Sequence, residues 1–473
     1  MVFYIAVSFL SGILCARLRW NIVAAVAGLI PAGVVFLIAT QEHDAPTLRT
    51  HIVRIAWCAL CFLFGACYLN LYVAWHTRAA LLPFGTTVDF TAIVSGAPMR
   101  TDKYEIIPVA STNPSGQAIA LFESLKSDGQ YKYGDLLQIS GKIESPKTAA
   151  DDPAMFFANV DFVAADKGSW LVGKMIGFKT AILKKFDAVL PQDEAALLGG
   201  ITVGGTAGMS SALKDAMSVS GTSYITTMYG FKIAIITLML GETLAGILPR
   251  RMIFLFAVAV IVLFLVMSGG SASAARAGIM SALALFAKES GRIFNMKNAL
   301  ALSATGMALF DPRILMEPAF QLSFLSILGI VYLAPPLKTL IHYRSPGILE
   351  WRENAIIAAT TLAAIMPVIL ADFGSFSLTA FFSNTFIMMA VLPLMVLGLA
   401  VASLGALSYY LSFFVAKMAE ILLWYQLGVI KIFTAFVMPL PTIFGTPVFA
   451  VAYYCALIAF AARHETTQRM AIE

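Results

Sequence analysis

Long, uninterrupted apolar runs recur along the whole chain, and they set the strongest limit on how it folds. Charged residues make up only 12% of the 473 residues, whereas hydrophobic residues make up 59%. A water-soluble domain carries roughly a quarter charged residues, so the main solvent of this chain is lipid. Because hydrocarbon offers no hydrogen-bond partners to the backbone, spanning segments must be helices of about 20 residues or closed barrels. These runs are continuous and do not alternate, so we expect a polytopic α-helical membrane protein.

The N-terminal part contains three apolar segments and then a stretch of very different composition. Residues 1–85 are expected to form transmembrane helices at Val2–Leu18, Ile22–Ala39 and Ile55–Trp75. Residues 86–166 contain short β-rich runs separated by Gly, Asn, Asp and Pro. About five strands at this spacing predict a small, OB-like β-barrel inserted into the chain. Four of the strands are expected at Val88–Val94, Tyr104–Val109, Gln117–Phe122 and Leu136–Ile143.

The predicted barrel is acidic, although the chain as a whole is basic. Between Thr86 and Asp166 there are six basic and eleven acidic side chains, a net charge of −5, whereas the whole chain carries +5. A domain that binds nucleic acid by itself is expected to be basic. This charge argues against strong DNA binding by the barrel alone.

A lysine-rich amphipathic helix is predicted within residues 167–192. Its apolar residues recur at helical spacing from Leu171 to Phe186, and Pro191 ends it. Such a helix suits the surface of an anionic bilayer; its charges come from Lys174, Lys179, Lys184 and Lys185. Residues 193–465 then predict further apolar helices, several of them too short to cross an intact bilayer. These are expected at Tyr224–Leu248, Met252–Met267, Arg276–Ala287, Ala299–Phe310, Ala319–Leu333, Ala355–Ala371, Leu378–Leu407, Leu411–Met438 and Pro447–Ala462.

The loop charges predict an orientation in the cell inner (plasma) membrane, because cytoplasmic loops are enriched in Lys and Arg. If each segment after the barrel crosses once, one side holds essentially only Arg313. The other side holds Arg250, Arg251, Lys288, Arg292, Lys297, Lys338, Arg344, Arg352, Arg463 and Arg469. We therefore expect an extracytoplasmic barrel and a cytoplasmic C-terminal tail; Arg17 and Arg19 are the exception to the pattern.

The sequence contains no pattern typical of a cofactor or metal site. The five cysteines lie in apolar segments, and the five histidines are scattered without H-x-H or H-E-x-x-H spacing. The glycines from Gly199 to Gly208 lack the G-K-[ST] of a phosphate loop, and no strand precedes them. We expect these glycines to separate short helices, and we expect no catalytic residue, no cofactor and no metal.

Four stretches of the chain contain motifs that can be compared with a known family. The first begins at Leu190 and reads LPQDEAALLGGITVGGTAGMSSALKDAMSVSGTSYITTMYGFKI. The second is SASAARAGIM (Ser271–Met280), the third is DPRILMEPAFQLSFLSILGI (Asp311–Ile330) and the fourth is MPVILADFGSFSLTAFFSNTFIMMAVLPL (Met366–Leu394). In order and spacing they resemble the ComEC competence family, in which the DNA-import channel of natural transformation is found. The family counterparts read LP…EAALLLG, SGTSH and SGLHV for the first stretch, S…RA..M for the second, NP…L..PGFQLSFLAVLGI for the third and P…..FG.FS…..N…..PL for the fourth.

Two departures from the family pattern bear on function. Tyr224 stands where the family has a histidine, and Tyr229 and Lys232 replace the serine and histidine of the following motif. Lysine does not titrate near neutral pH as histidine does, which puts a proton-linked role in doubt. Many family members also carry a C-terminal metallo-β-lactamase-like domain, but the H-x-H-x-D-H motif is absent from this sequence. We therefore expect a short form that is not itself a nuclease.

Polar groups inside lipid are costly and therefore suggest function. The resemblance places seven of them on the expected DNA path: Ser223, Tyr224, Tyr229, Lys232, Arg276, Gln321 and Asn384. Structural alternatives remain open. Lys232 would then be a snorkelling lysine near a helix end, Arg276 a partner of a helix C-terminus or a carboxylate, and the two amides interhelical hydrogen-bonding groups.

The resemblance implies a membrane channel that passes single-stranded transforming DNA into the cytoplasm. It also implies partners: an extracytoplasmic DNA receptor, a cytoplasmic helicase-like motor, single-strand-binding proteins and a separate nuclease. Two alternatives remain, a transporter of another solute on the same scaffold and a membrane-embedded enzyme. For an enzyme, Asp215, Glu242, Asp311 and Glu317 would have to meet in three dimensions.

Overall fold

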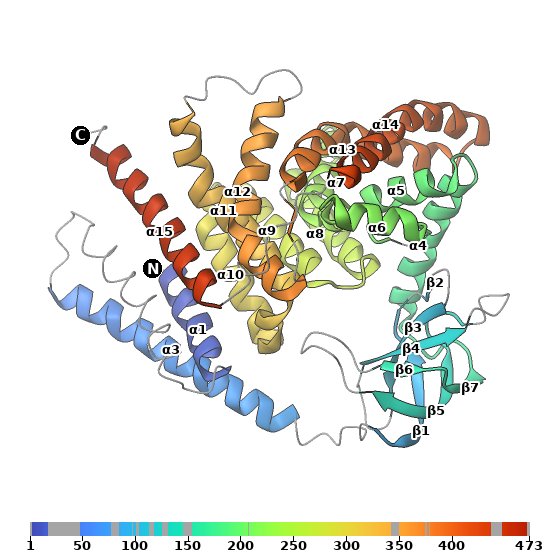
Figure 1. Cartoon of the computed structure of the whole chain (residues 1–473), viewed down its shortest axis with the longest axis horizontal. Helices are drawn as coiled ribbons and strands as arrows, with labels where there is room; N and C mark the ends of the chain where they lie inside the picture. The colour runs from blue at the N-terminus through green and yellow to red at the C-terminus, as the bar shows by residue number, and fades with distance from the viewer. Residues whose placement is uncertain are drawn as a thin grey trace.

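The computed structural model describes residues 2–17, 48–76, 85–96, 98–100, 104–112, 118–124, 131–144, 154–206, 208–341, 350–373, 376–377, 379–436 and 447–470. Within these residues, a large helical part adjoins a small β-barrel (Figure 1). The predicted span Ile22–Ala39 lies outside the described residues. The fold class expected from the sequence, a helical membrane protein with an inserted β-barrel, is confirmed.

Five of the strands close into a barrel in the order β1-β3-β4-β6-β5, and β5 pairs with β1 to complete the circle. All of these contacts are antiparallel except that between β4 and β6. A five-stranded barrel of this kind is typical of an OB-fold. Outside this closed ring, strand β2 pairs with β3 and strand β7 pairs with β5. The bounds are β1 Thr87–Val94, β2 Met99–Arg100, β3 Tyr104–Ser111, β4 Ala118–Ser124, β5 Leu136–Glu144, β6 Ala154–Phe156 and β7 Asn159–Ala164.

The barrel has its own apolar core, because alternate residues of each strand point inward. Ala92 and Val94 of β1 alternate with more exposed neighbours and are fully buried. Ile107, Leu121 and Leu137 come from three other strands and complete the same cluster. All four predicted strands are present. Three short strands of the sheet, β2, β6 and β7, were not located from the sequence.

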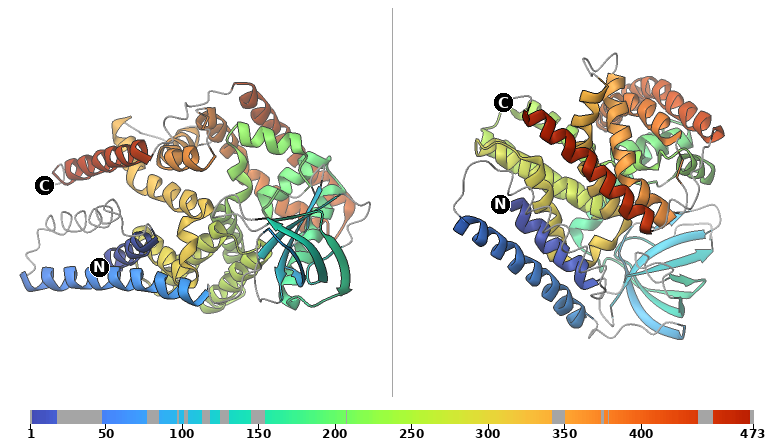
Figure 2. Two further views of the ribbon diagram at one scale, coloured as in Figure 1. Left: turned by 60° about the horizontal axis from the view of Figure 1, so that its bottom comes forward. Right: turned by 60° about the vertical axis from the view of Figure 1, so that its left-hand side comes forward.

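At the N-terminus, α1 (Val2–Arg17) and α3 (Leu48–His76) pack closely against each other. A side chain at Gly12 would collide with the backbone of Phe62, so the two helices approach there because glycine has no Cβ. This helix pair lies beside α10, and Tyr68 Oη donates a 2.6 Å hydrogen bond to the carbonyl of Leu309. Figure 2 shows this pair at the edge of the helical part.

One amphipathic helix, α4 (Trp170–Asp187), leads from the barrel to the remaining helices (Figure 1). It is followed by α5 (Gln192–Thr202), α6 (Ser211–Val219), the 3₁₀ helix η1 (Ser223–Thr227) and α7 (Tyr229–Leu244). The sequence predicted one span over Tyr224–Leu248; the structure instead ends η1 at Thr227 and starts a new helix at Tyr229.

The rest of the chain is helical, and its element bounds follow the apolar runs closely. The elements are α8 Arg250–Met267, α9 Ala272–Glu289, α10 Met296–Phe310, η2 Pro312–Met316, α11 Pro318–Leu340, α12 Trp351–Phe373, α13 Thr379–Leu404, α14 Tyr409–Ala435 and α15 Pro447–Met470. Among the described helices, six are long and apolar enough to cross a membrane: α3, α8, α11, α12, α13 and α14. The protein is therefore a multi-pass membrane protein.

The helices form three packed groups. The first contains α4, α5, α6, α13 and α14, and its core includes Leu198 and Leu394. The second contains α1, α3, α9, α10 and α11. The third contains α7, α8 and α9 and is centred on Ile233 and Ile261. The loop containing η1 contributes Ile225 to the first group and leads into α7, which contributes residues to both the first and the third group.

Candidate functional site

The turn from α6 into η1 is shaped by one glycine and is held against α13. Gly221 adopts a φ of 69°, in the left-handed region that favours glycine. A Cβ on this residue would come within 2.5 Å of the Cβ of Ala380, so α13 packs directly on the turn. The preceding Ser220 is fully buried, and its carbonyl accepts a 2.7 Å hydrogen bond from Ser383 Oγ. The first and fourth family-like stretches therefore meet here.

Lys232 ties the end of α5 to η1. Its side chain is 1% exposed, and Nζ donates hydrogen bonds of 2.6 Å each to the carbonyls of Gly200 and Thr226. Gly200 lies in the last turn of α5, where carbonyls lack an intrahelical donor. The ammonium also lies 5.0 Å from the centre of the Tyr229 ring, a cation–π distance. A buried cation thus binds helix-end carbonyls, and in the described part of the chain it has no carboxylate partner.

Arg276 reaches the same loop through two serines. Its Nε donates a 2.6 Å hydrogen bond to Ser323 Oγ, which in turn donates to Ser273 Oγ at 3.2 Å. Ser273 Oγ then donates to the carbonyl of Thr227, at the end of η1, at 3.4 Å. The second and third family-like stretches, on α9 and α11, are joined to the first in this way.

The guanidinium of Arg276 is nine-tenths buried, yet no carboxylate among the described residues pairs with it. Its other contacts are the sulfur of Met280 at 3.7 Å from Nη1 and the ring of Phe324 at 5.8 Å from Cζ. Because a guanidinium has five donors, several of them remain available for an anionic group.

The polar loop from Ser220 to Thr227, with Lys232 and Arg276 bound to it, is called the η1 junction below. Of the predicted residues, Ser223, Tyr224 and Tyr229 belong to it or follow it directly. Ser223 is exposed, Tyr224 packs against the α5–α13–α14 core, and the buried Tyr229 makes an edge contact with Phe264. Their predicted role in a DNA path stays a prediction.

The two predicted amides have different surroundings. Gln321 lies two residues before Ser323, but its Nε2 donates to the carbonyl of Leu315 at 3.1 Å. Asn384 is 3% exposed and follows Ser383 on α13; its Oδ1 is buried and has no hydrogen-bond partner within the described ranges. Asn384 therefore lies beside the η1 junction, whereas the Gln321 side chain bonds to the preceding helix η2.

Sequence reasoning did not identify the groups that assemble the junction. These are Gly200, Ser220, Thr226, Ser273, Ser323 and Ser383. All of them lie within the four quoted stretches. Their only sequence signal is a small hydroxyl or glycine inside an otherwise apolar helix, which is too common to mark a site.

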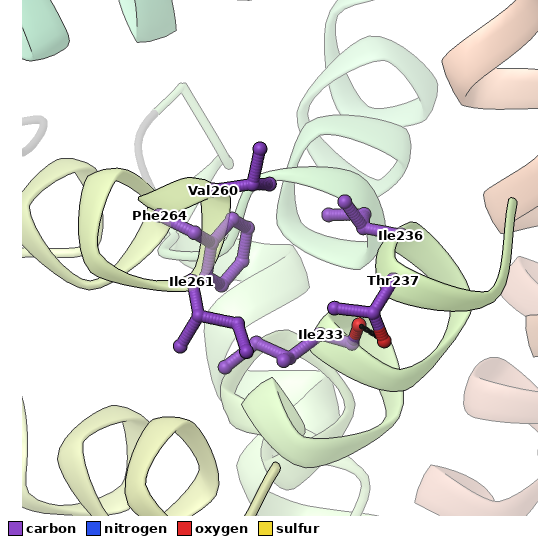
Figure 3. Close-up of a pocket in the computed structure, with 6 residues that line it drawn as sticks. All are labelled: Ile233, Ile236, Thr237, Val260, Ile261 and Phe264. Atoms are coloured by element: carbon purple, nitrogen blue, oxygen red, sulfur yellow. Dashed lines mark hydrogen bonds between the residues drawn. The ribbon is translucent and has the colours of Figure 1, made fainter. Parts of the chain in front are cut away.

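A small pocket lies between α7 and α8 and is almost entirely apolar (Figure 3). Its lining is Ile233, Ile236, Thr237, Val260, Ile261 and Phe264. The one hydroxyl, Thr237 Oγ1, donates to the carbonyl of Ile233 on its own helix at 2.8 Å. This pocket has no charged group to bind a polar solute. In the ranges that the structure describes, no three metal-ligating side chains come together.

Comparison with known protein families tests the resemblance. The model of the family described as "Competence protein" matches residues 201–467, more than half of the chain. The chain belongs to the competence protein family. The match contains the η1 junction almost entirely, since only Gly200 lies outside it.

A curated relative supports the same assignment. The chain is 23% identical over 238 residues to ComE operon protein 3 of Bacillus subtilis (strain 168). The aligned region covers 49% of this chain and 30% of that protein, so the match spans less than a third of the relative's length. No solved structure matches the chain.

Proposed function

We propose that this competence-family protein forms a membrane conduit that passes single-stranded transforming DNA into the cytoplasm. One observation carries the proposal: the four family-like stretches meet at the η1 junction, with two buried cations that have no carboxylate partner among the described residues. Phosphate groups passing a conduit need cationic or polar contacts that are weak enough to release them again. Arg276 has donors available for such contacts.

The expected arrangement in the cell is part of this proposal. The barrel faces outward, the amphipathic α4 lies at the membrane surface and the C-terminal tail lies in the cytoplasm, as the loop charges predict. Residues 1–85, 86–166, 167–192 and 193–465 act as the N-terminal helices, the barrel, the interfacial helix and the conduit. An outer DNA receptor, a helicase-like motor, single-strand-binding proteins and a separate nuclease act with it.

The test is an uptake assay in the natural host. The gene is deleted, and transformation and entry of labelled DNA are measured after complementation with the wild type, Arg276→Gln or Arg292→Gln. Arg292 is exposed in the loop after α9 and provides the matched loss of one charge. We expect the deletion and Arg276→Gln to reduce uptake and Arg292→Gln to restore it fully. Normal uptake in the deletion strain would refute the conduit.

A further inference from the structure

Two of the four lysines of α4, Lys179 and Lys185, lie on sides of the helix that face the protein. Lys174 and Lys184 are exposed, and Lys185 donates a 3.1 Å hydrogen bond to the carbonyl of Ala402, near the end of α13. Lys179 instead falls on the stripe of Met175, Ile182 and Phe186, which packs against the other helices. It has no hydrogen-bond or ion-pair partner within the described ranges.

The Lys179 ammonium lies against the turn that follows α5, opposite Lys232. Gly204 and Gly205 form this turn with φ of 91° and 96°. A Cβ on Gly204 would be 3.3 Å from Lys232 Nζ, and a Cβ on Gly205 would be 3.4 Å from Lys179 Nζ. Two lysine side chains from different helices therefore converge on adjacent glycines, and their charges repel each other.

This arrangement is electrostatically unbalanced. Burying a charge is costly unless an opposite charge or several hydrogen bonds compensate it. Lys232 is buried and has its two carbonyl partners, whereas Lys179 is part-buried and has no partner among the described residues, and no described carboxylate pairs with either ammonium. A Cβ on Gly205 would meet only the Lys179 ammonium, so the backbone is open to close approach on that side, whereas Gly204 is buried against the Tyr229 ring.

We propose that Lys179, at the open side of the Gly204–Gly205 turn, binds a phosphodiester group of the passing single strand, with the buried Lys232 behind the turn adding positive charge without touching the phosphate. This proposal rests on the proposed function and adds to it a specific contact before the η1 junction. Lysine binds phosphate as a point charge, without a requirement for base identity. An anionic lipid headgroup offers the same chemistry, but the exposed Lys174 and Lys184 are the lysines of α4 that face outward. The inward position of Lys179 favours the strand.

The test uses the full-length protein in nanodiscs of zwitterionic lipid and a fluorescein-labelled oligo-dT. Binding is measured as a function of salt for the wild type, Lys179→Gln, Lys179→Arg and Lys184→Gln. We expect Lys179→Gln to weaken binding about three- to tenfold at low salt and to lower the log–log salt slope by about 0.7, the value of one single-strand phosphate contact. Lys179→Arg keeps the charge and the slope, and Lys184→Gln matches the wild type.

The other outcomes separate the two proposals. If the wild type fails to bind the strand, the conduit and the contact are both refuted. If it binds and Lys179→Gln has the same slope as Lys184→Gln, only the contact is wrong. A Lys179→Gln defect that persists with a methylphosphonate probe, which lacks backbone charge, overturns the phosphate assignment. A defect seen only after anionic lipid is added assigns the site to a lipid headgroup and overturns the strand.

Discussion

Replacing Lys232 by methionine removes the buried ammonium and keeps an unbranched apolar side chain in its place. The carbonyls of Gly200 and Thr226 then lose their hydrogen bonds, each 2.6 Å long in the structure. A hydrogen bond to a charged group contributes about 1.5–3 kcal/mol. Part of this is offset, because the variant no longer buries a charge. We expect a net loss of about 2–4 kcal/mol in the free energy of unfolding.

The assay is an SDS titration of the purified protein in mixed micelles, followed by tryptophan fluorescence. The matched control is Lys417→Met, which removes a half-exposed lysine paired with Glu420 at 2.5 Å. An exposed pair of this kind contributes about 0–1 kcal/mol. Equal destabilisation by the two variants would contradict the conclusion that Lys232 holds α5 against η1.

Three further predictions follow from the geometry. Ser323→Ala removes the hydroxyl that bridges Arg276 and Ser273. We expect it to lower the free energy of unfolding by about 1–2 kcal/mol and to reduce DNA uptake. The control is Ser326→Ala, which should change neither quantity because the Ser326 hydroxyl bonds to Leu322 of its own helix. Gly204→Ala places a Cβ 2.7 Å from the Tyr229 ring at a φ of 91°, so it should lower the free energy of unfolding by at least about 1–2 kcal/mol. A Cβ at Gly241 meets open space, so Gly241→Ala should leave the free energy of unfolding unchanged or raise it in the same SDS titration. A C-terminal fusion to a fluorescent protein should fluoresce and a fusion to alkaline phosphatase should be inactive; the reverse pattern would overturn the predicted orientation.

The spans were predictable because burial in lipid requires a uniform apolar run that sequence displays directly. The expected span Leu378–Leu407 differs from α13 by only a few residues at its ends. The break between η1 and α7 was not predictable, because the residues on both sides of it are apolar or small. It arises from tertiary contacts, above all the hydrogen bonds of Lys232.

The candidate site could be located from the sequence, but its internal connections could not. Lys232 and Arg276 stand out as cations in apolar helices, and both lie at the junction. The partners of Lys232 are backbone carbonyls, which carry no residue-type signal, and one of them is 32 residues away. Arg276 bonds to Ser323, 47 residues away along the chain, and Ser323 bonds to Ser273, 50 residues away; such pairings appear only after the helices have packed.

The convergence of five helices on one short loop has a mechanical consequence. Contacts from α5, α7, α9, α11 and α13 all end on or beside the segment Ser220–Thr227. A displacement of any one helix must therefore strain or break the contacts of the others. A movement at this point would therefore have to break several of these contacts together, so the five helices are mechanically coupled through one short loop.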